Sequence, residues 1–245
     1  MTETMTSDLN RLRLSYLAAN FEDFINKCDR EQCTTKSIVE RLVQHELMEK
    51  DRRGIQRRLR AARLGHFKKI LDFDWNWPKS INRGKIESLL EGQFVDAKRN
   101  IILAGAQGLG KTMLAKNIAY QSVIKGKTAL FTTASDLVMT LQSKDNQVEI
   151  NRALKRYSSP HLLVIDELGY LSYDCKAADL IFEVINRRYE TGSIIFTTNL
   201  AFKDWNKIFP GAACLTAMID RITHHLDVLK LEGESYRLME SKKGK

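Results

Sequence analysis

The sequence of 245 residues lacks any long apolar run. Its longest apolar stretches, at residues 101–106 and 162–165, are far shorter than the roughly 20 residues of a membrane-spanning helix. The first ten residues, MTETMTSDLN, also lack the basic start and apolar middle of a secretory signal. These absences argue against a membrane or secreted protein, and we expect a cytoplasmic protein without a membrane partner.

Cysteine is also scarce, with four residues and no C-x-x-C pair. Cys28, Cys33 and His45 do not have the spacing typical of a zinc site. In a cytoplasmic chain, thiols stay reduced. We therefore expect reduced thiols rather than a disulfide framework or a zinc module.

The overall composition is that of a globular protein with a basic surface. Hydrophobic residues make up 43% and charged residues 28%, which excludes a disordered chain or a fibre. The formal net charge is +9 and the isoelectric point is about 9.4. This charge favours an anionic partner, which is nucleic acid in the first place and an acidic membrane surface as the alternative.

The positive charge is concentrated in one segment. Residues 50–70, KDRRGIQRRLRAARLGHFKKI, contain nine basic side chains and one acidic one, whereas residues 1–49 carry a net charge of −3. Ile55, Leu59 and Ala62 recur at helical spacing, which predicts a basic amphipathic helix. Its basic face is either simply solvated or binds DNA phosphates. The candidate DNA contacts are Arg53, Arg57, Arg58, Arg60 and Arg63.

Hydrophobic spacing divides the chain into three parts. Residues 1–70 are predicted to form a small all-helical domain, with one helix that starts at a cap on Ser7 or Asp8 and runs through Cys28. A second helix is predicted after Thr34-Thr35, running through Met48. Residues 71–99 form a connector. From residue 100 to 245, apolar strands alternate with helices, which predicts an α/β fold with a central parallel sheet flanked by helices. The strands are predicted at 100–104, 128–133, 162–167 and 193–198, and further helices at 136–157, 175–189 and 215–224.

A phosphate-binding motif follows the first of these strands. Residues 105–112, GAQGLGKT, fit the pattern G-x-x-x-x-G-K-T between a strand and a helix. Lys111 is expected to reach the β- and γ-phosphates of ATP, and the Thr112 hydroxyl to bind Mg²⁺. The predicted ATP-binding residues are Gly105, Ala106, Gln107, Gly108, Leu109, Gly110, Lys111, Thr112 and Met113.

Two carboxylates end the strand predicted at 162–167. We expect Asp166 to hold Mg²⁺ together with Thr112, and Glu167 to polarise the attacking water. Asn199 follows the next strand, where it either positions that water or contacts the γ-phosphate, or is simply a turn residue.

Other basic residues are candidates whose positions the spacing does not determine. Arg221 and Arg237 are candidates for stabilising the charge that develops during phosphoryl transfer. Lys144, Lys155 and Arg156 lie in the predicted helix 136–157, which is either a second DNA surface or an ordinary solvated helix.

Together the motifs resemble those of a known family. The set GAQGLGKT, LLVIDELGYL, RRYETGSIIFTTN, AFKDW, AMIDRITHH and GESYRL resembles the IstB-like ATP-binding proteins of insertion sequences, which are AAA+ relatives of the DnaC helicase loaders. The resemblance covers essentially the whole chain. It implies an ATPase that assembles on duplex DNA in several copies and helps a cognate transposase by preparing the target.

The resemblance also suggests residue roles. Asn199 matches the sensor asparagine, Arg221 the arginine finger that acts across a subunit boundary, and Arg237 the second sensor. Only 24 residues follow Arg221, too few for the helical lid of many AAA+ proteins.

Two other functions share most of these motifs. A helicase loader would have nearly the same ATP site, but its amino-terminal helices would hold a helicase. A small-molecule kinase would use Glu167 as the general base for an acceptor hydroxyl.

Overall fold

The computed structural model describes residues 3–77, 81–236 and 239. They form two compact units, which divide between Arg57 and Arg58. The division lies before the domain boundary that we predict at residue 70. It also falls inside the basic segment, so the positive charge of residues 50–70 is shared between the two units.

The first unit is helical. Its core consists of Leu9, Leu17, Phe24 and Cys28. The ring of His45 stacks on that of Tyr16, with centroids 4.5 Å apart. All four cysteines of the chain are free thiols. The helices are α1 (Glu3–Arg11), α2 (Ser15–Arg30) and α3 (Thr35–Ala62), the last of which continues into the second unit.

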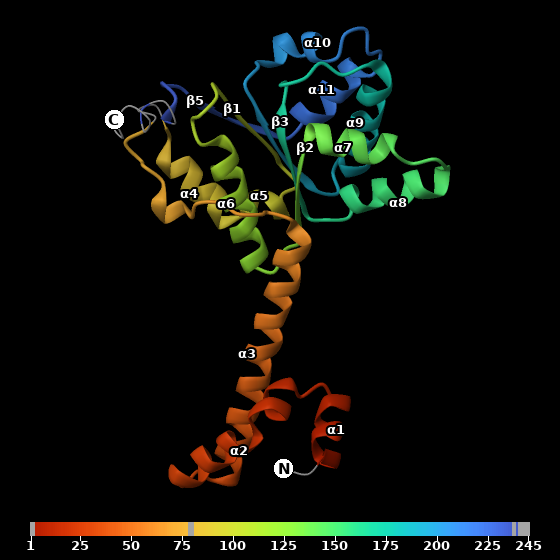
Figure 1. Ribbon diagram of the computed structural model, residues 1–245. Coiled ribbons are helices and arrows are strands. Elements are labelled where there is room, and N and C mark those ends of the chain that lie inside the picture. The colour runs from red at the N-terminus through yellow and green to blue at the C-terminus, as the bar shows by residue number, and fades with distance from the viewer. Residues whose placement is uncertain (1–2, 78–80, 237–238, 240–245) are drawn as a thin grey trace. The chain divides into compact units, whose positions relative to one another are not determined.

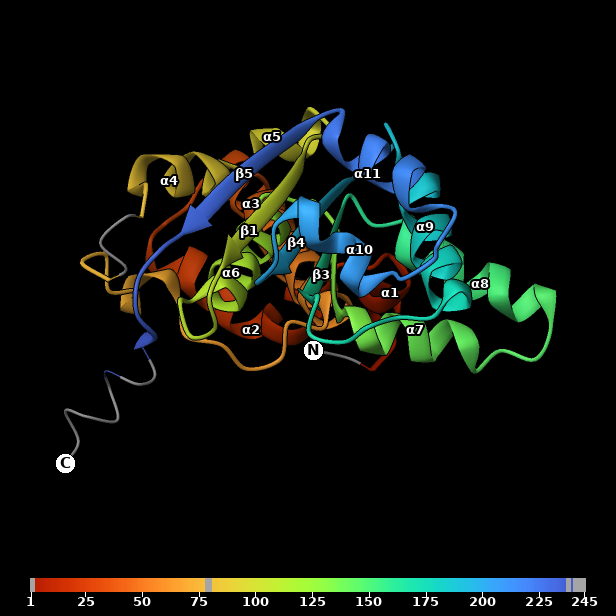
Figure 2. The ribbon, with the colours of Figure 1, turned by 90° about the horizontal axis from the view of Figure 1, so that it is seen from above.

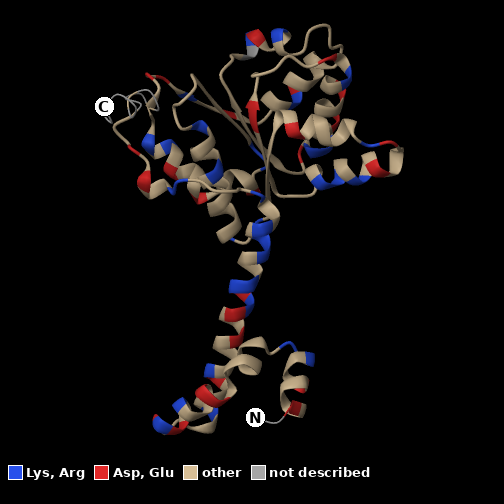
Figure 3. Ribbon diagram, viewed as in Figure 1, with Lys and Arg blue, Asp and Glu red and all other residues tan. Residues whose placement is uncertain are grey.

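Helix α3 joins two elements that we predict separately. It contains the predicted helix over 34–48 and continues without a break through the basic segment to Ala62. Figure 3 shows the basic residues gathered along its second half.

The second unit contains a five-stranded parallel sheet in the order β2-β3-β4-β1-β5. This arrangement confirms the predicted α/β fold, and the four predicted strands form at the expected positions. The fifth, at the edge beside β1, is an addition. The strands are β1 (Asn100–Gly105), β2 (Ala129–Thr133), β3 (Leu162–Leu168), β4 (Ser193–Thr198) and β5 (Leu226–Leu231).

Helices cover both faces of the sheet (Figures 1 and 2). Alternate strand residues point to opposite faces: Ile101 and Leu103 pack with α6, whereas Ile102 packs with α7 and α9. The first layer contains α4 (Arg83–Glu91), α5 (Gln93–Asp96) and α6 (Lys111–Ile124). The second contains α7 (Ala134–Gln142), α8 (Gln147–Ser158), α9 (Cys175–Arg188), α10 (Trp205–Ile208) and α11 (Leu215–Thr223). Short 3₁₀ turns are η1 (Ile70–Asp72) and η2 (Phe202–Asp204).

The predicted helix over 136–157 is wrong as a single element, because α7 and α8 are separate. The Ser143 hydroxyl donates to the carbonyl oxygen of Thr140 at 3.0 Å, and the Asn146 side chain caps α8 by accepting from the Glu149 amide at 2.9 Å. Such side chains offer the backbone an alternative to helical hydrogen bonds. The connector 71–99 likewise contains η1, α4 and α5.

The buried side chain of Arg188 in α9 forms hydrogen bonds to the backbone at the end of α8, just before β3 and at the start of β4. The Arg188 side chain is 1% exposed, and its guanidinium donates to the carbonyl oxygens of Tyr157, Ser158, His161 and Ser193 at 2.8–3.2 Å. Burial lowers the pKa of Arg188 to about 10, so the group stays charged at neutral pH. A Cβ at position 192 would lie 2.6 Å from its Nη2 atom, so a side chain there would displace the guanidinium.

Within the residues that the structure describes, no helix is both long and apolar enough to cross a membrane.

Candidate functional site: a phosphate-binding loop and an acidic pair

The motif 105–112 forms a tight loop between β1 and the first residue of α6, Lys111. Gly108 and Gly110 have φ values of 81° and 83°, a left-handed conformation that favours glycine. At Gly108 a side chain is also excluded, because a Cβ there would lie 2.0 Å from the Ser235 Oγ atom. The predicted strand, loop and helix are thus confirmed, and the loop leads into a helix N-terminus, which favours anions.

The Lys111 side chain folds back over this loop. It is 6% exposed, and its Nζ atom donates to the carbonyl oxygens of Gly105 and Ala106 at 2.7 Å each. The loop therefore holds a buried ammonium group beside the N-terminus of α6. This concentration of positive charge is suited to phosphate.

Asp166 lies opposite the loop at the end of β3, where it is 3% exposed. The Thr112 hydroxyl donates to both carboxylate oxygens at 3.0 Å, and the Thr197 hydroxyl donates to Oδ1. A carboxylate and a hydroxyl in contact supply the hard oxygen ligands that Mg²⁺ prefers. The residue types and geometry fit the predicted metal pair, Thr112 and Asp166.

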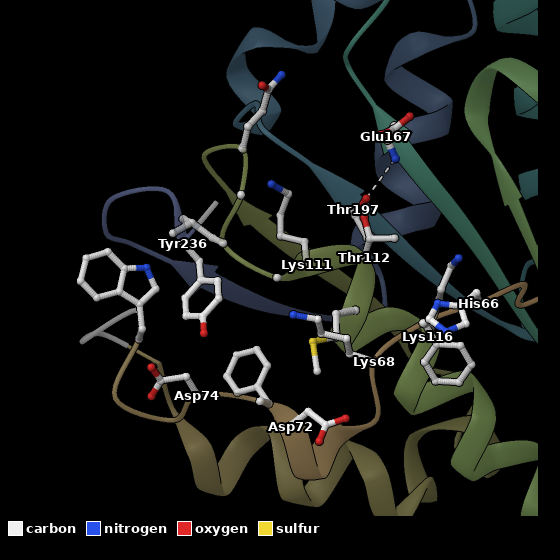
Figure 4. Close-up of a pocket in the computed structure, with 18 of the residues that line it drawn as sticks. His66, Lys68, Asp72, Asp74, Lys111, Thr112, Lys116, Glu167, Thr197 and Tyr236 are labelled. Carbon is white, nitrogen blue, oxygen red and sulfur yellow. Dashed lines mark hydrogen bonds between the residues drawn. The ribbon is translucent and has the colours of Figure 1, made fainter. Parts of the chain in front are cut away.

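Glu167 has an unusual backbone conformation. Its φ is 61°, and the register of β3 against β4 shifts between Ile165 and Leu168. Such a bulge redirects a side chain. The Glu167 side chain is exposed at the cavity, while its amide donates to the Thr197 hydroxyl at 2.9 Å (Figure 4).

The loop and Glu167 open into a cavity of about 440 Å³. Two other segments complete its wall. The first follows α3 directly and supplies His66, Phe73, Asp74 and Trp77. The second is the segment after β5, which supplies Tyr236. In Figure 4, Asp72 and Asp74 of the first segment lie below Lys111, and Tyr236 of the second lies to the left of it.

Hydrogen bonds connect the second of these segments to the phosphate-binding loop and the two segments to each other. The Tyr236 amide donates to the Gly108 carbonyl oxygen at 3.1 Å, and the Trp77 indole N–H donates to the Glu234 carbonyl oxygen at 2.9 Å. Sequence reasoning missed Thr197, His66, Phe73 and Tyr236. The connector also contains Trp75 and Trp77, which the sequence indicates as packing residues or, alternatively, as aromatics beside a nucleotide base.

Asn199 and Arg221 are not among the residues that line this cavity. Asn199 is exposed one residue beyond β4, with its Oδ1 beside Gly169. The Arg221 guanidinium lies 5.0 Å from the Phe182 ring centroid, and Arg221 shares a small cleft with Asn100 at the start of β1. That end of the strand is opposite to the phosphate-binding loop of the same chain. Arg237 lies outside the described residues.

The basic candidates fall into both units. Arg53 and Arg57 belong to the first unit, and the Arg53 guanidinium donates to the Ser15 hydroxyl. Those in the second unit are Arg58, Arg60 and Arg63 near the end of α3, Lys144 between α7 and α8, and Lys155 and Arg156 on α8.

Comparison with known proteins gives consistent results along the chain. Residues 7–244 match the family model described as IstB-like ATP binding protein. A protein of insertion sequence IS5376 from Geobacillus stearothermophilus, described as ATP-binding, is 35% identical over 242 residues, covering 99% of this chain and 96% of the relative. Its counterpart from IS21 of Pseudomonas aeruginosa is 34% identical over 235 residues, covering 96% and 89%.

Solved structures with a similar fold have lower sequence identity. AMPPCP-bound DnaA from Aquifex aeolicus matches with a TM-score of 0.59 and 18% identity, over 74% of this chain and 55% of that chain. DnaI matches with a TM-score of 0.55 and 20% identity, over 70% and 90%. The likeness confirms the predicted AAA+ fold.

Proposed function

The chain belongs to the IstB-like ATP-binding proteins, and on this premise we propose that it binds and hydrolyses ATP as the helper of an insertion-sequence transposase. In this role it assembles in several copies on duplex DNA and prepares or selects the target. The relatives from IS5376 and IS21, both described as ATP-binding, support the first part of this proposal. The contact between Thr112 and Asp166 beside the phosphate-binding loop carries it.

In this proposal each residue of the ATP site has a separate role in hydrolysis. Lys111 and the amides at the start of α6 bind the phosphates, and Thr112 and Asp166 would hold Mg²⁺, which neutralises phosphate charge when bound. The Glu167 carboxylate accepts a proton from the attacking water. Thr197 positions Glu167, because the Thr197 hydroxyl accepts a hydrogen bond from the Glu167 amide and donates one to the Asp166 carboxylate.

The position of Arg221 favours a site shared between subunits. It lies at the amino-terminal end of β1, whereas the phosphate-binding loop follows the carboxyl end. Arg221 therefore acts on the ATP of a neighbouring copy, while Asn199 serves as the sensor of its own site. ATP then stabilises the interface between copies, and hydrolysis loosens it.

DNA is the second anion that the chain binds. Residues 1–70, and the basic half of α3 in particular, supply arginines to phosphates without reading bases. Such binding weakens steeply with salt.

The proposal is tested by measuring ATP hydrolysis and duplex binding with the purified full chain. We expect hydrolysis without any acceptor molecule, stimulation by duplex DNA, and multimeric complexes on DNA with a slowly hydrolysed ATP analogue. Undetectable duplex affinity at low salt, together with tight binding of a replicative helicase, would support a loader instead. Consumption of ATP only in the presence of an acceptor hydroxyl would support a kinase.

A further inference from the structure

A second hollow lies along the outer edge of β2, and we call it the β2 groove. Its volume is about 600 Å³, and none of the described residues lines both this groove and the ATP cavity. The groove is lined by Arg63, which follows α3, and by Arg156 of α8. Asp136 and Thr140 of α7 and Ser143, directly after α7, also line it. The groove thus joins two basic segments that are far apart in sequence.

The floor of the groove has unpaired backbone. In the described sheet β2 is hydrogen-bonded only to β3, so its other edge presents amide and carbonyl groups. Leu130, Phe131 and Thr132 of this strand line the groove.

Arg63 occupies a position where arginine is unfavourable. It directly follows the last residue of α3, and its φ is 53°. Glycine is the usual residue in this left-handed position after a helix. The same left-handed conformation is found two residues after the ends of α1, α2, α5 and α9, at Arg13, Gln32, Lys98 and Glu190. At Arg63 it ends α3, and the side chain of Arg63 lines the groove.

The chemistry of the groove matches a phosphodiester. Arg63 and Arg156 are both exposed, and guanidinium groups bind phosphate through two parallel hydrogen bonds. Thr140 and Ser143 add hydroxyls, and Asp136 is the one acidic side chain among the described residues that line the groove. We propose that the β2 groove binds the sugar–phosphate backbone of DNA. This inference rests on the proposed function, and it brings two candidate DNA contacts from distant segments, Arg63 and Arg156, together in one binding surface.

The first test compares two double variants of the full chain. Arg63→Gln with Arg156→Gln removes both groove charges, whereas Arg152→Gln with Lys176→Gln removes two exposed charges of the same unit outside the groove. We expect the groove variant to bind duplex DNA at least about tenfold more weakly and to lower the salt slope of binding by about two. The control should stay close to wild type, and both should bind ATP normally.

Two single variants separate a binding role from a structural one. Arg63→Gly removes the guanidinium and relieves the strained backbone, so DNA affinity should fall while the unfolding temperature does not. Asp136→Asn removes the opposing charge, so affinity should rise. A loss of stability without a loss of affinity in Arg63→Gly would mean that Arg63 is structural.

Crosslinking places the ligand directly. Met139 lines the groove and is 65% exposed, whereas Val148, at 69%, lies on α8 outside it. A p-benzoyl-phenylalanine in place of Met139 should crosslink to duplex or single-stranded DNA, and one in place of Val148 should not. If wild type binds no DNA, the proposed function fails. If wild type binds but the groove and control variants behave alike, or Met139 crosslinks only to added peptide, the groove inference alone is wrong.

Discussion

The amide of Glu167 donates to the hydroxyl of Thr197, 2.9 Å away on the neighbouring strand. The same hydroxyl donates to Asp166, so one side chain of β4 fixes both acids of β3. Thr197 is 1% exposed, and water therefore cannot replace this contact easily. Its role in the site is to position the two acids.

Thr197→Val should lower the ATP hydrolysis rate at least about tenfold, because the Glu167 amide loses its acceptor and the acid shifts. ATP affinity should change little, and Thr197→Ser should restore much of the rate. The matched control is Thr198→Val, since Thr198 is equally buried but accepts only from the Leu200 amide at 3.1 Å. Equal losses of rate in the two valine variants would contradict this role.

Glu167→Gln should retain ATP binding and slow hydrolysis by about 100-fold or more, as expected for loss of a general base. Because ATP is then consumed slowly, complexes with duplex DNA should last longer. Single-turnover hydrolysis and DNA dissociation rates measure the two effects. Wild-type turnover in this variant would remove Glu167 from the role.

Mixing Arg221→Ala with Glu167→Gln subunits should partly restore hydrolysis. In some interfaces of the mixture, the intact Glu167 of an Arg221→Ala subunit meets the intact Arg221 of a Glu167→Gln subunit, and such a site is complete. Neither variant alone should show this activity. Mixing Lys111→Ala with Glu167→Gln is the control, since both residues belong to one cavity and every interface stays defective. No recovery in the first mixture would argue against a shared site.

Arg188→Met should lower the free energy of unfolding by about 3–5 kcal/mol, because four backbone carbonyls lose a charged donor inside the protein. Arg187→Met is the control. Arg187 forms a partly exposed ion pair with Glu183 at 2.6 Å, so its removal should cost less than about 1 kcal/mol. Chemical denaturation measures both, and similar losses would show that the buried contacts contribute little.

What the sequence predicts well in this chain is local. The motif 105–112 requires a strand before it and a helix after it, and each is specified by a continuous stretch of residues. The acidic end of β3 is likewise contiguous with its apolar run. Because such patterns depend on neighbours in sequence, the loop, Asp166 and four strands could be located without a structure.

What the sequence misses depends on distant segments meeting. Thr197 gains its role only because β4 lies beside β3, and Tyr236 only because the segment after β5 returns to the loop. The groove needs residues 63 and 156 to lie together. The strand β5, LDVLKL, has four apolar residues in six, but its place at the edge of the sheet depends on pairing with β1, which is distant in sequence.

The strand order also determines when the site can exist during synthesis. Strand β1, which leads into the phosphate-binding loop, has β4 and β5 as its neighbours, and both are made much later by the ribosome. Tyr236 then contacts Gly108. A nascent chain or a fragment that stops before residue 226 has the complete GAQGLGKT motif, yet it exposes one edge of β1 and lacks one wall of the cavity. The ATP site is therefore among the last parts of the protein to form.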